Sequence, residues 1–402
     1  MSEKITFAPI SYTGWGALTH LLGEVERFDV KKILIVTDPF LNKIGLTNQV
    51  AEPLKEAGYL IDIYIDTLPE PPLAIGEKLV KYTRNNQFEM VIGVGGGSAL
   101  DLTKLAGVLV SHEGNVEDYL NLTGTKKISK KGIPTILIPT TSGTGSEVTN
   151  ISVLSLESTK DVVTHDYLLA DVAIIDPALT TSLPPNITAS TGIDALTHAI
   201  EAYVSKNRNV VTDALALQAI RLIGQSIRKA VSNGENKQAR IDMSYGSYLA
   251  GLAFFNAGVA GVHALAYPIG GQYHIAHGDS NAVLLPYVMG YIRESCEKEM
   301  KEIYDALGFS SVNLTIGEAS YKCVEELRKL VRDVNIPSTL KDFNIPEEGL
   351  DRLTSEALKQ QRLLARSPIP LLEEDIYTIY KASFNGQIVQ KEEKEEVKAY
   401  KS

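Results

Sequence analysis

Cysteine is scarce in this sequence, because its 402 residues include only Cys296 and Cys323. Two cysteines cannot build the disulfide framework of a small secreted protein, and their spacing is not that of a Cys-x-x-Cys pair. Long apolar runs are also missing. The N-terminal MSEKITFAPI has no signal-peptide core, and the longest apolar stretch, 90–110, is broken by Asp101 and Lys104. We therefore expect a reduced, cytoplasmic protein that has no membrane partner.

Positive charge is in deficit. Lysine and arginine number 39 against 49 aspartates and glutamates, which gives a formal net charge of -10. This charge repels phosphate backbones, and no basic patch is visible, so we expect no nucleic-acid partner. The 44% hydrophobic and 22% charged residues are typical of a soluble globular chain. The length favours two to three domains at about 150 residues each.

The first half of the chain alternates short β-branched runs with segments of helical periodicity, such as 48–57 and 73–84. Near-continuous apolar strands separated by helices indicate a parallel sheet that is covered on both faces. The predicted strands are 33–37, 60–65, 90–94, 135–138 and 172–175.

The strand pattern stops at about Pro184, where a proline pair marks a plausible boundary. Long helices are predicted after it, over 191–204, 213–231 and 240–255. We therefore predict an α/β nucleotide-binding domain over 1–184 and an all-helical metal and substrate domain over 185–402. The charged C-terminal segment 391–402 is expected to be a solvated helix end or tail.

A glycine-rich segment, Gly95-Gly96-Gly97-Ser98, follows a predicted strand and begins a helical pattern. Glycines let the backbone approach a phosphate closely, and the free N–H groups at a helix start favour negative charge. The spacing differs from the usual dinucleotide fingerprint, and no acidic residue follows about 20 residues later. The alternative is a tight strand-to-helix turn. We favour phosphate binding.

Two more polar segments follow predicted strands. Asp38 comes directly after strand 33–37, where a carboxylate can accept hydrogen bonds from ribose hydroxyls, although a turn or N-cap role is the simpler interpretation. The segment 139–149, PTTSGTGSEVT, is rich in small hydroxyls and glycines. It is suited to lining a cofactor cleft, and the alternative is a flexible surface loop.

A potential metal site comes from histidine clustering. Asp194 and His198 are four residues apart, so both project from one helix face. Three of the seven histidines fall within 263–278, at His263, His274 and His277. One carboxylate with three imidazoles suits Fe²⁺ or Zn²⁺ and leaves positions for substrate or water. The alternative is ordinary core and surface histidines.

These segments together resemble the iron-containing alcohol dehydrogenase family. The resemblance runs through nearly the whole chain, in family order. It rests on GGGS with Asp101, PTTSGTGSEVT, Asp176-Pro177, GIDALTHAIEAY, the 263–278 block and the NAVLLP that begins at Asn281. It implies an N-terminal parallel-sheet dinucleotide-binding domain followed by an all-helical metal-binding domain, which is the dehydroquinate synthase-like fold. The cleft between the two domains would hold the site.

The resemblance also implies roles for individual residues. The metal ligands of the family match Asp194, His198, His263 and His277. Its cofactor-binding positions match Asp38, Gly95, Gly96, Gly97, Ser98, Thr140, Thr141, Thr144, Thr149, Lys160 and Leu179. The Asp38 carboxylate is expected to favour NAD over NADP, because it repels a 2′-phosphate. His274 is then a non-ligand that lines the substrate channel.

The chain departs from the family at Tyr267, where many members carry a histidine assigned to substrate positioning or proton relay. A tyrosine can donate and accept a hydrogen bond, or it can simply narrow the pocket, and both interpretations stay open. The frequent Asn-Pro-Arg of the family appears here as Ser367-Pro368-Ile369.

The implied activity is hydride transfer between NAD(H) and a primary or secondary alcohol, aldehyde or ketone, with Fe²⁺ or Zn²⁺ as the metal. Glycerol dehydrogenases and maleylacetate reductases are alternatives, and the latter work without these four ligands. A dehydroquinate synthase-type lyase would need a basic pocket for a phosphate. The helical half shows no such cluster of lysine and arginine around the ligands, which counts against this class. A non-catalytic binding protein is a third class. Family members are commonly homo-oligomers. The specific alcohol is not encoded in any of these motifs.

Overall fold

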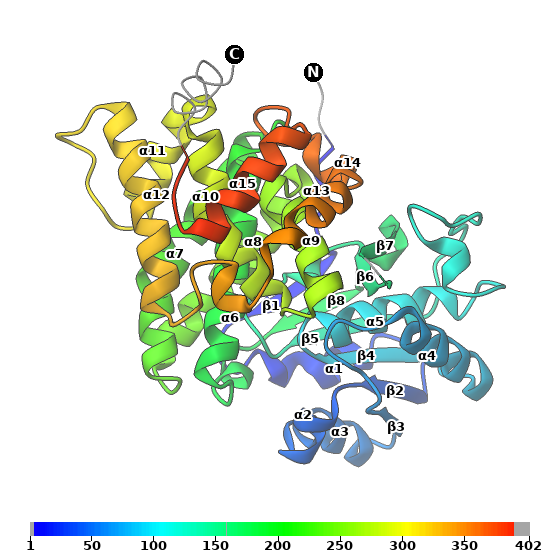
Figure 1. Ribbon diagram of the computed structural model, residues 1–402. Coiled ribbons are helices and arrows are strands. Elements are labelled where there is room, and N and C mark those ends of the chain that lie inside the picture. The colour runs from blue at the N-terminus through cyan, green and yellow to red at the C-terminus, as the bar shows by residue number, and fades with distance from the viewer. Residues whose placement is uncertain (1–3, 158, 390–402) are drawn as a thin grey trace.

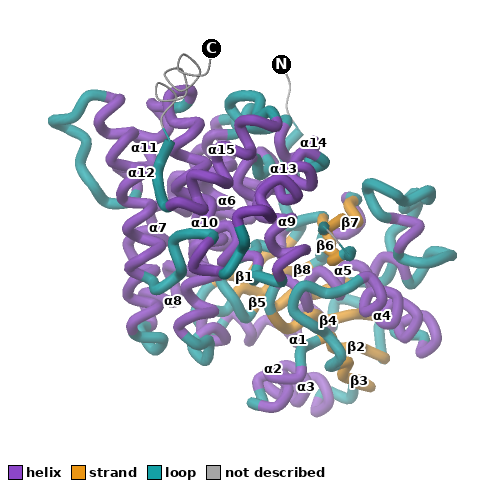
Figure 2. Tube along the Cα trace, viewed as in Figure 1, coloured by secondary structure: helices purple, strands orange, loops and turns teal. Residues whose placement is uncertain are grey.

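The computed structural model describes residues 4–157 and 159–389, so the charged segment 391–402 lies outside it. Figure 1 shows two halves, with the strands gathered in the half built from the first part of the chain and a bundle of helices in the other. Figure 2 separates them by element type, since the part of the chain described after Ile175 contains helices and loops and no strand. The predicted fold class, an α/β half followed by a helical half, is confirmed.

A six-stranded parallel sheet forms the first half, in the order β1-β8-β5-β4-β2-β3. All five predicted strands are present, within a residue of their predicted ends. Their bounds, with the first strand, are β1 Ile10–Thr13, β2 Lys32–Val36, β3 Leu60–Tyr64, β4 Met90–Gly95, β5 Thr135–Pro139 and β8 Val172–Ile175.

The sequence pattern did not predict β1, nor the antiparallel hairpin of β6 Ile151–Ser155 and β7 Lys160–Thr164. The β1 residues Ile-Ser-Tyr-Thr are partly exposed and give no apolar run. They become a strand by pairing with β8 at the edge of the sheet, from Ile10 opposite Val172 to Thr13 opposite Ile175. Tertiary pairing therefore decides these elements.

Alternate residues of the central strands enter two separate cores. Ile33 and Ile35 of β2 pack on the face covered by α1 and α3, whereas Leu34 and Val36 pack on the face covered by α4 and α5. Both faces are therefore buried, as a parallel sheet requires. The helices of this half are α1 Leu21–Val25, α2 Pro39–Lys43, α3 Leu46–Glu56, α4 Leu73–Asn86 and α5 Gly97–Leu109.

The helical half is built around one large apolar core that draws on most of its helices. In it α6, α7 and α8 pack against one another, with α9 and α10 beside α6. The helices of this half are α6 Pro185–Val204, α7 Val210–Ser232, α8 Lys237–Ala257, α9 Gly261–Tyr273, α10 His277–Ile292, α11 Glu297–Ala306, α12 Ile316–Asp333, α13 Leu350–Leu358, α14 Gln361–Leu364 and α15 Glu373–Asn385.

One described helix, α7, is long and apolar enough to cross a membrane, and α8 and α9 would be so only if taken together, although they are bent by 104° relative to each other. The apolar side of α7 packs between α6 and α8 and supplies Ile220, Ile223 and Ile227 to the core. The packing of α7 in the core accounts for its apolar composition.

A buried ion pair ties the start of α5 to the hydroxyl-rich loop and to β6. The Lys104 ammonium lies 2.8 Å from the Asp101 carboxylate and donates to the Ser146 carbonyl oxygen at 3.0 Å. Asp101 also accepts hydrogen bonds from the Ser146 hydroxyl at 2.5 Å and from the Val153 N–H at 2.9 Å. Burial lowers the pKa of Lys104, and the adjacent Asp101 opposes that shift. The pair therefore holds the loop over the sheet edge.

The two halves touch along the edge of the sheet. Val148 of the hydroxyl-rich loop packs with Leu252 of α8 in a small apolar cluster. Trp15, which follows β1, contacts Lys237, the first residue of α8. The Lys237 ammonium lies over the indole ring, 4.5 Å from its centroid.

Candidate metal and cofactor site

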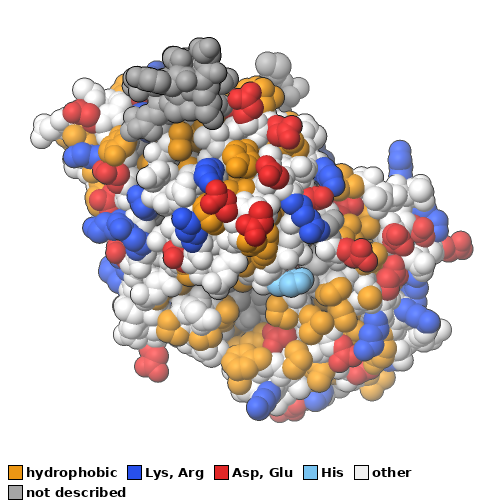
Figure 3. All heavy atoms as spheres, viewed as in Figure 1, with side chains coloured by type: hydrophobic (Ala, Val, Ile, Leu, Met, Phe, Trp, Pro, Cys, Tyr) orange, Lys and Arg blue, Asp and Glu red, His pale blue; other side chains and the backbone are white. Residues whose placement is uncertain are grey.

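A cavity of about 370 Å³ lies where the two halves meet. The face in Figure 3 is hollowed there, and acidic and basic side chains are interspersed over the rest of that face. Gly97, Ser98 and Thr149 line the cavity from the α/β half, and His198, His263 and His277 line it from the helical half. Residues from both halves of the structure thus line one cavity.

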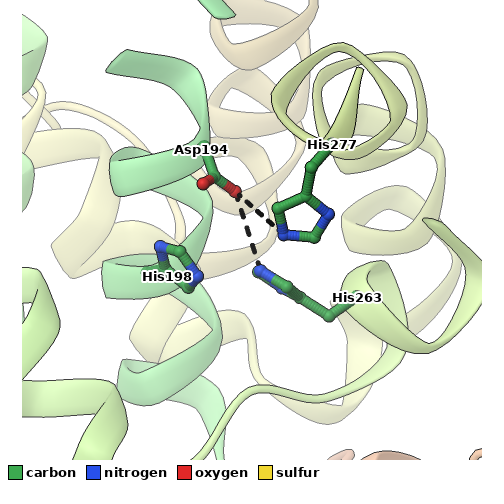
Figure 4. A group of neighbouring side chains, drawn as sticks. All are labelled: Asp194, His198, His263 and His277. Atoms are coloured by element: carbon green, nitrogen blue, oxygen red, sulfur yellow. Dashed lines mark ion pairs between the residues drawn. The ribbon is translucent and has the colours of Figure 1, made fainter. Parts of the chain in front are cut away.

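Asp194, His198, His263 and His277 converge at this cavity from three helices, α6, α9 and α10 (Figure 4). One donor atom from each lies within 4.8 Å of the others. The Nε2 atoms of His263 and His277 are each 3.7 Å from Asp194 Oδ1. The i, i+4 spacing on α6 places Asp194 and His198 on one face. One carboxylate oxygen and three imidazole nitrogens make a donor set that fits Fe²⁺ or Zn²⁺.

Burial sets the charge state of these donors. It lowers the pKa of His198 to about 4 and that of His277 to about 3, so both imidazoles are neutral near neutral pH. Burial alone would raise the pKa of Asp194, but the three imidazoles and the Asn281 amide hold it below its usual value. Neutral imidazoles and an ionised carboxylate are the forms that bind a metal ion.

Glu201 is a functional candidate that the sequence interpretation missed. Its fully buried carboxylate accepts hydrogen bonds from His263 Nδ1 at 2.5 Å and from the Val262 N–H at 2.6 Å. The bond to Nδ1 leaves the lone pair of His263 Nε2, which lies 3.7 Å from Asp194 Oδ1, available to a metal ion. A signal was present, because Glu201 follows Asp194 by seven residues and so lies on the same face of α6.

Close packing of α10 on α6 brings His277 to Asp194. A Cβ at Gly278 would lie 2.2 Å from the Ser190 carbonyl oxygen, so only glycine fits there. One turn further along α10, the Asn281 side-chain amide donates to Asp194 Oδ1 at 2.7 Å. The sequence motif gave Asn281 no role of its own, and in the structure it hydrogen-bonds a candidate ligand.

The glycine-rich segment forms the start of α5, with Gly96 as its N-cap. The first N–H groups of a helix have no carbonyl partner within it, so those of Gly97 and Ser98 can receive an anion. Of the four predicted residues in this segment, Gly97 and Ser98 line the cavity, whereas Gly95 and Gly96 lie behind them. This wall can hold a pyrophosphate.

The hydroxyl-rich loop packs directly against the glycine segment. The Thr140 N–H donates to the Gly95 carbonyl oxygen at 3.0 Å, and the Thr141 and Thr144 side chains lie beside Gly96 and Gly97. Thr144 and Thr149 also line the cavity. The Thr149 hydroxyl accepts a hydrogen bond from Lys104 at 3.2 Å. All four predicted threonines therefore lie in this wall or directly behind it.

Asp38 serves as the N-cap of α2. Its Oδ1 accepts a hydrogen bond from the Leu41 N–H at 2.9 Å, as the turn interpretation expects. Its Oδ2 lies 4.0 Å from the position of a Cβ on Gly95, at the start of the glycine segment. One oxygen therefore stays available beside that segment. Leu179, by contrast, is buried in the core below the sheet and does not line the cavity.

Lys160 lies in the cavity wall, at the start of β7, and forms an ion pair with Glu70. Glu70 also accepts a hydrogen bond from the His277 N–H at 3.2 Å. This carboxylate, from the loop between β3 and α4, was not anticipated from the sequence. It connects the α/β half to the helix that carries one of the four donors.

Tyr267 is buried in the cavity wall, and its ring centroid is 5.9 Å from that of His277. Burial raises the pKa of Tyr267 to about 12, so the hydroxyl stays protonated near neutral pH. Phe254 also lines the cavity and stacks on His198 at 4.2 Å. His274 does not line the cavity, and that expectation is wrong. α9 ends at Tyr273, and His274 is exposed in a left-handed conformation with φ of 54°.

The expectation that the helical half brings no basic residues to the ligands is also wrong. Arg362 and Arg366 line the cavity together with Lys160. The two arginines follow α13, more than eighty residues after the histidine block. Only the tertiary fold brings them to the site.

Comparisons with known proteins agree with this arrangement. Residues 9–177 match the family model described as iron-containing alcohol dehydrogenase, and residues 188–384 match the C-terminal model of the same family. The chain is 67% identical over 387 residues to "Long-chain-alcohol dehydrogenase 1" of Geobacillus thermodenitrificans, covering 96% of this chain and 98% of the relative.

Solved structures are similar over nearly the whole chain. A 1,3-propanediol oxidoreductase has a TM-score of 0.91 at 35% identity, covering 96% of this chain and 100% of that structure. A sulfoacetaldehyde reductase from Bifidobacterium kashiwanohense, solved in complex with NAD+, has a TM-score of 0.86 at 28% identity, covering 95% and 99%.

Metal content distinguishes the four donors from His274. We expect His263→Ala and His277→Ala each to lower metal occupancy after loading with Fe²⁺ or Zn²⁺, because each removes one donor. The matched variant His274→Ala should bind metal as the wild type does. Elemental analysis of the dialysed proteins measures this. Loss of metal in His274→Ala with retention in His277→Ala would overturn the assignment.

Glu201 should control metal affinity without contacting the metal. We expect Glu201→Ala to weaken metal binding by roughly 10- to 100-fold, because the His263 ring loses the acceptor that orients it. Glu201→Gln keeps an acceptor for His263 and should lose less. Competition with a chelator measures both, and Glu325→Gln, at an exposed position of α12, is the control. Equal affinity in Glu201→Ala and the wild type would contradict this role.

Proposed function

The chain belongs to the iron-containing alcohol dehydrogenase family and is an oxidoreductase of alcohols and aldehydes, and we propose that it works with NAD(H) and a divalent metal ion in the cavity described above. The observation that supports this most strongly is the convergence of Asp194, His198, His263 and His277 on the cavity that Gly97 and Ser98 line from the opposite side. A metal site and a pyrophosphate site in one space are what this reaction needs. Neither the lyase nor a non-catalytic binding protein matches this family membership.

The four donors would hold the metal ion, and the start of α5 would hold the pyrophosphate of the cofactor. When bound, the metal ion supplies Lewis-acid polarisation of the substrate oxygen, and NAD⁺ supplies the hydride acceptor. The residues of the chain bind and orient the substrate and the cofactor, and they exclude water from the cavity. Phe254, Val259 and Tyr267 give the cavity apolar walls beside the histidines, and such walls strengthen the electrostatic interactions inside.

Tyr267 carries the hydroxyl of this wall. Because its raised pKa keeps that hydroxyl protonated, Tyr267 is suited to donate a hydrogen bond to a substrate oxygen and not to act as a general base. Lys160 and its partner Glu70 close the cavity on the side of the β6–β7 hairpin.

NAD(H) as the cofactor and Fe²⁺ as the metal are the finer parts of the proposal. The first is supported by the free Asp38 oxygen beside the glycine segment and by the NAD+ complex of the similar sulfoacetaldehyde reductase. The second is supported by the family description, and Zn²⁺ suits the same donors.

Four further proposals rest on the family resemblance and the sequence pattern. We infer that the enzyme is a cytoplasmic homo-oligomer and that its substrate is a small alcohol or carbonyl compound. We also place the boundary between the nucleotide-binding domain and the metal-binding domain at residues 184 and 185, directly before α6 begins at Pro185.

The proposed function predicts turnover that depends on metal. Metal-stripped protein, reloaded with Fe²⁺ or Zn²⁺, should oxidise NADH in the presence of short aldehydes, ketones or dihydroxyacetone. The stripped protein should not, because the substrate oxygen is then unpolarised. Absorbance at the NADH band measures the rate. Full activity without metal, or none with either metal on any of these carbonyl compounds, would contradict the proposal.

Asp38 should set the choice between the two nicotinamide cofactors. Repulsion between its charge and a 2′-phosphate near 4 Å is about 1 to 4 kcal/mol, which is roughly five-fold to several-hundred-fold in affinity. We expect the wild type to prefer NAD(H), and Asp38→Gly to raise kcat/KM for NADPH and lower it for NADH.

Asp38→Asn is the matched control, because it keeps an N-cap acceptor for Leu41 and removes only the charge. It should gain NADPH activity at unchanged thermal stability. A purely structural aspartate would instead leave the NADH-to-NADPH ratio unmoved in both variants, with stability lost in Asp38→Gly.

A further inference from the structure

Two arginines in the cavity wall have no carboxylate partner. Arg362 lies on α14 and Arg366 lies two residues beyond its end, and both line the cavity that contains the histidine donors. Within residues 4–157 and 159–389, no carboxylate lies within 4.0 Å of either guanidinium, although many other lysines and arginines form ion pairs with carboxylates. A partly buried arginine without a partner normally finds an anion.

The two carboxylates that line the cavity, Glu70 and Asp101, are already paired. Asp101 lies 2.8 Å from the Lys104 ammonium and Glu70 forms an ion pair with Lys160, while Asp194, beside the cavity, belongs to the four-donor cluster. The two guanidinium charges are therefore surplus in this space. Burial lowers the pKa of Arg366, and the charge of Arg362 adds to that shift, so the two positive charges lie close enough to repel each other. A bound anion would offset both the burial of the Arg366 charge and its repulsion by Arg362.

Arg366 is held in place by the backbone of the helical half. A Cβ on Gly258 would lie 2.4 Å from both Cδ and Nη1 of Arg366, so the guanidinium packs directly on this glycine. Gly258 also has φ of +82°, where other residues are strained. The Arg366 carbonyl oxygen accepts a hydrogen bond from the Lys206 N–H at 3.0 Å. This is a built position and not a free surface side chain.

The last turn of α8 gives the separation between the arginines and the metal donors. Phe254 stacks on His198 at 4.2 Å, and the Gly258 N–H donates to the Phe254 carbonyl oxygen at 2.7 Å. Four residues of helix rise about 6 Å. Phe254 and Val259, which lie on and just after this turn, both line the cavity. An apolar stretch several carbons long therefore fits between the reacting centre and Arg366.

We propose that the preferred substrate is an alcohol or aldehyde with a negatively charged oxygen-bearing group, such as a carboxylate or sulfonate, several carbons from its reacting carbon, and that Arg362 and Arg366 bind this group. Guanidinium groups bind carboxylate and sulfonate oxygens through paired N–H donors. The apolar cavity wall covers the carbon chain of the substrate between its reacting carbon and its charged group. This inference rests on the proposed function, since it names the substrate class of the same cavity.

A matched substrate pair tests the subsite. We expect the metal-loaded wild type to show a higher kcat/KM for 6-hydroxyhexanoate than for 1-hexanol. Arg362→Gln and Arg366→Gln should each lower the value for 6-hydroxyhexanoate by roughly 10-fold or more, which is typical of a hydrogen bond to a charged group, and leave 1-hexanol within about two-fold. Arg352→Gln on the exposed side of α13 is the control.

Binding of hexanesulfonate gives a readout that does not need turnover. In the presence of NAD⁺, calorimetry should show hexanesulfonate binding to the wild type and to Arg352→Gln, and weaker binding to Arg362→Gln, which does not disturb the Gly258 packing. Equal binding to all three proteins would overturn the inference. So would equal losses for both substrates in the arginine variants, or an effect confined to the KM for NAD⁺.

The two levels of proposal fail differently. If neither alcohol yields NADH with metal present, the proposed function fails, and the hexanesulfonate titration still decides whether the two arginines bind an anion. If 1-hexanol is oxidised and 6-hydroxyhexanoate is no better a substrate, the proposed function stands and the inference is wrong.

Discussion

A carboxylate buried among helices costs several kcal/mol unless positive charge or hydrogen-bond donors compensate it. Asp194 is in this position on α6, almost completely inaccessible to solvent, and much of the helical half is arranged around it. Two imidazoles from α9 and α10 face its oxygen, one amide donates to it, and Glu201 fixes the ring of one imidazole from behind. Each of these partners needs its helix in close contact with α6, so the bundle packing and the donor geometry are one constraint.

The α/β half adds a different kind of site to the same cavity. Its contribution is backbone: N–H groups at the start of α5, held by a threonine-rich loop that the Asp101–Lys104 pair fastens to the helix. One wall offers side-chain atoms that can bind a metal ion, and the other offers backbone N–H groups that can bind an anion. This arrangement suits two ligands that must come into contact. Glu70 links the walls, because it contacts both Lys160 of the hairpin and the first N–H of α10.

The parts of the fold that follow from local pattern were predictable from sequence. The runs 33–37, 90–94 and 135–138 are apolar on both faces, which only a doubly covered parallel strand requires, and the structure has strands there. Strand β1 was missed because its four residues carry no apolar run and depend on β8 for pairing. For the site, Glu201 had a helical spacing that could have revealed it.

Arg362 had no such signal. A cationic residue in a short helix between loops has the pattern of an ordinary surface residue until the chain folds back over the histidines. His274 shows the opposite case. Its clustering with other histidines in the sequence suggested a place in the channel, but His274 itself adopts a left-handed conformation at the end of α9 and is exposed to solvent. The spacing of histidines in the sequence does not predict the backbone conformation of a residue at a helix end.

The contact between Trp15 and Lys237 gives this protein an internal optical probe. Trp15 is the single tryptophan of the chain, it belongs to the α/β half, and it is 41% exposed. The ammonium over its ring belongs to the first turn of α8, the helix whose last turn reaches the cavity. A cation over an indole face shifts its emission, so movement of α8 relative to the sheet changes the fluorescence of a single, unlabelled residue. The fluorescence of Trp15 therefore reports on the contact between the α/β half and α8 in the native protein, without an added label.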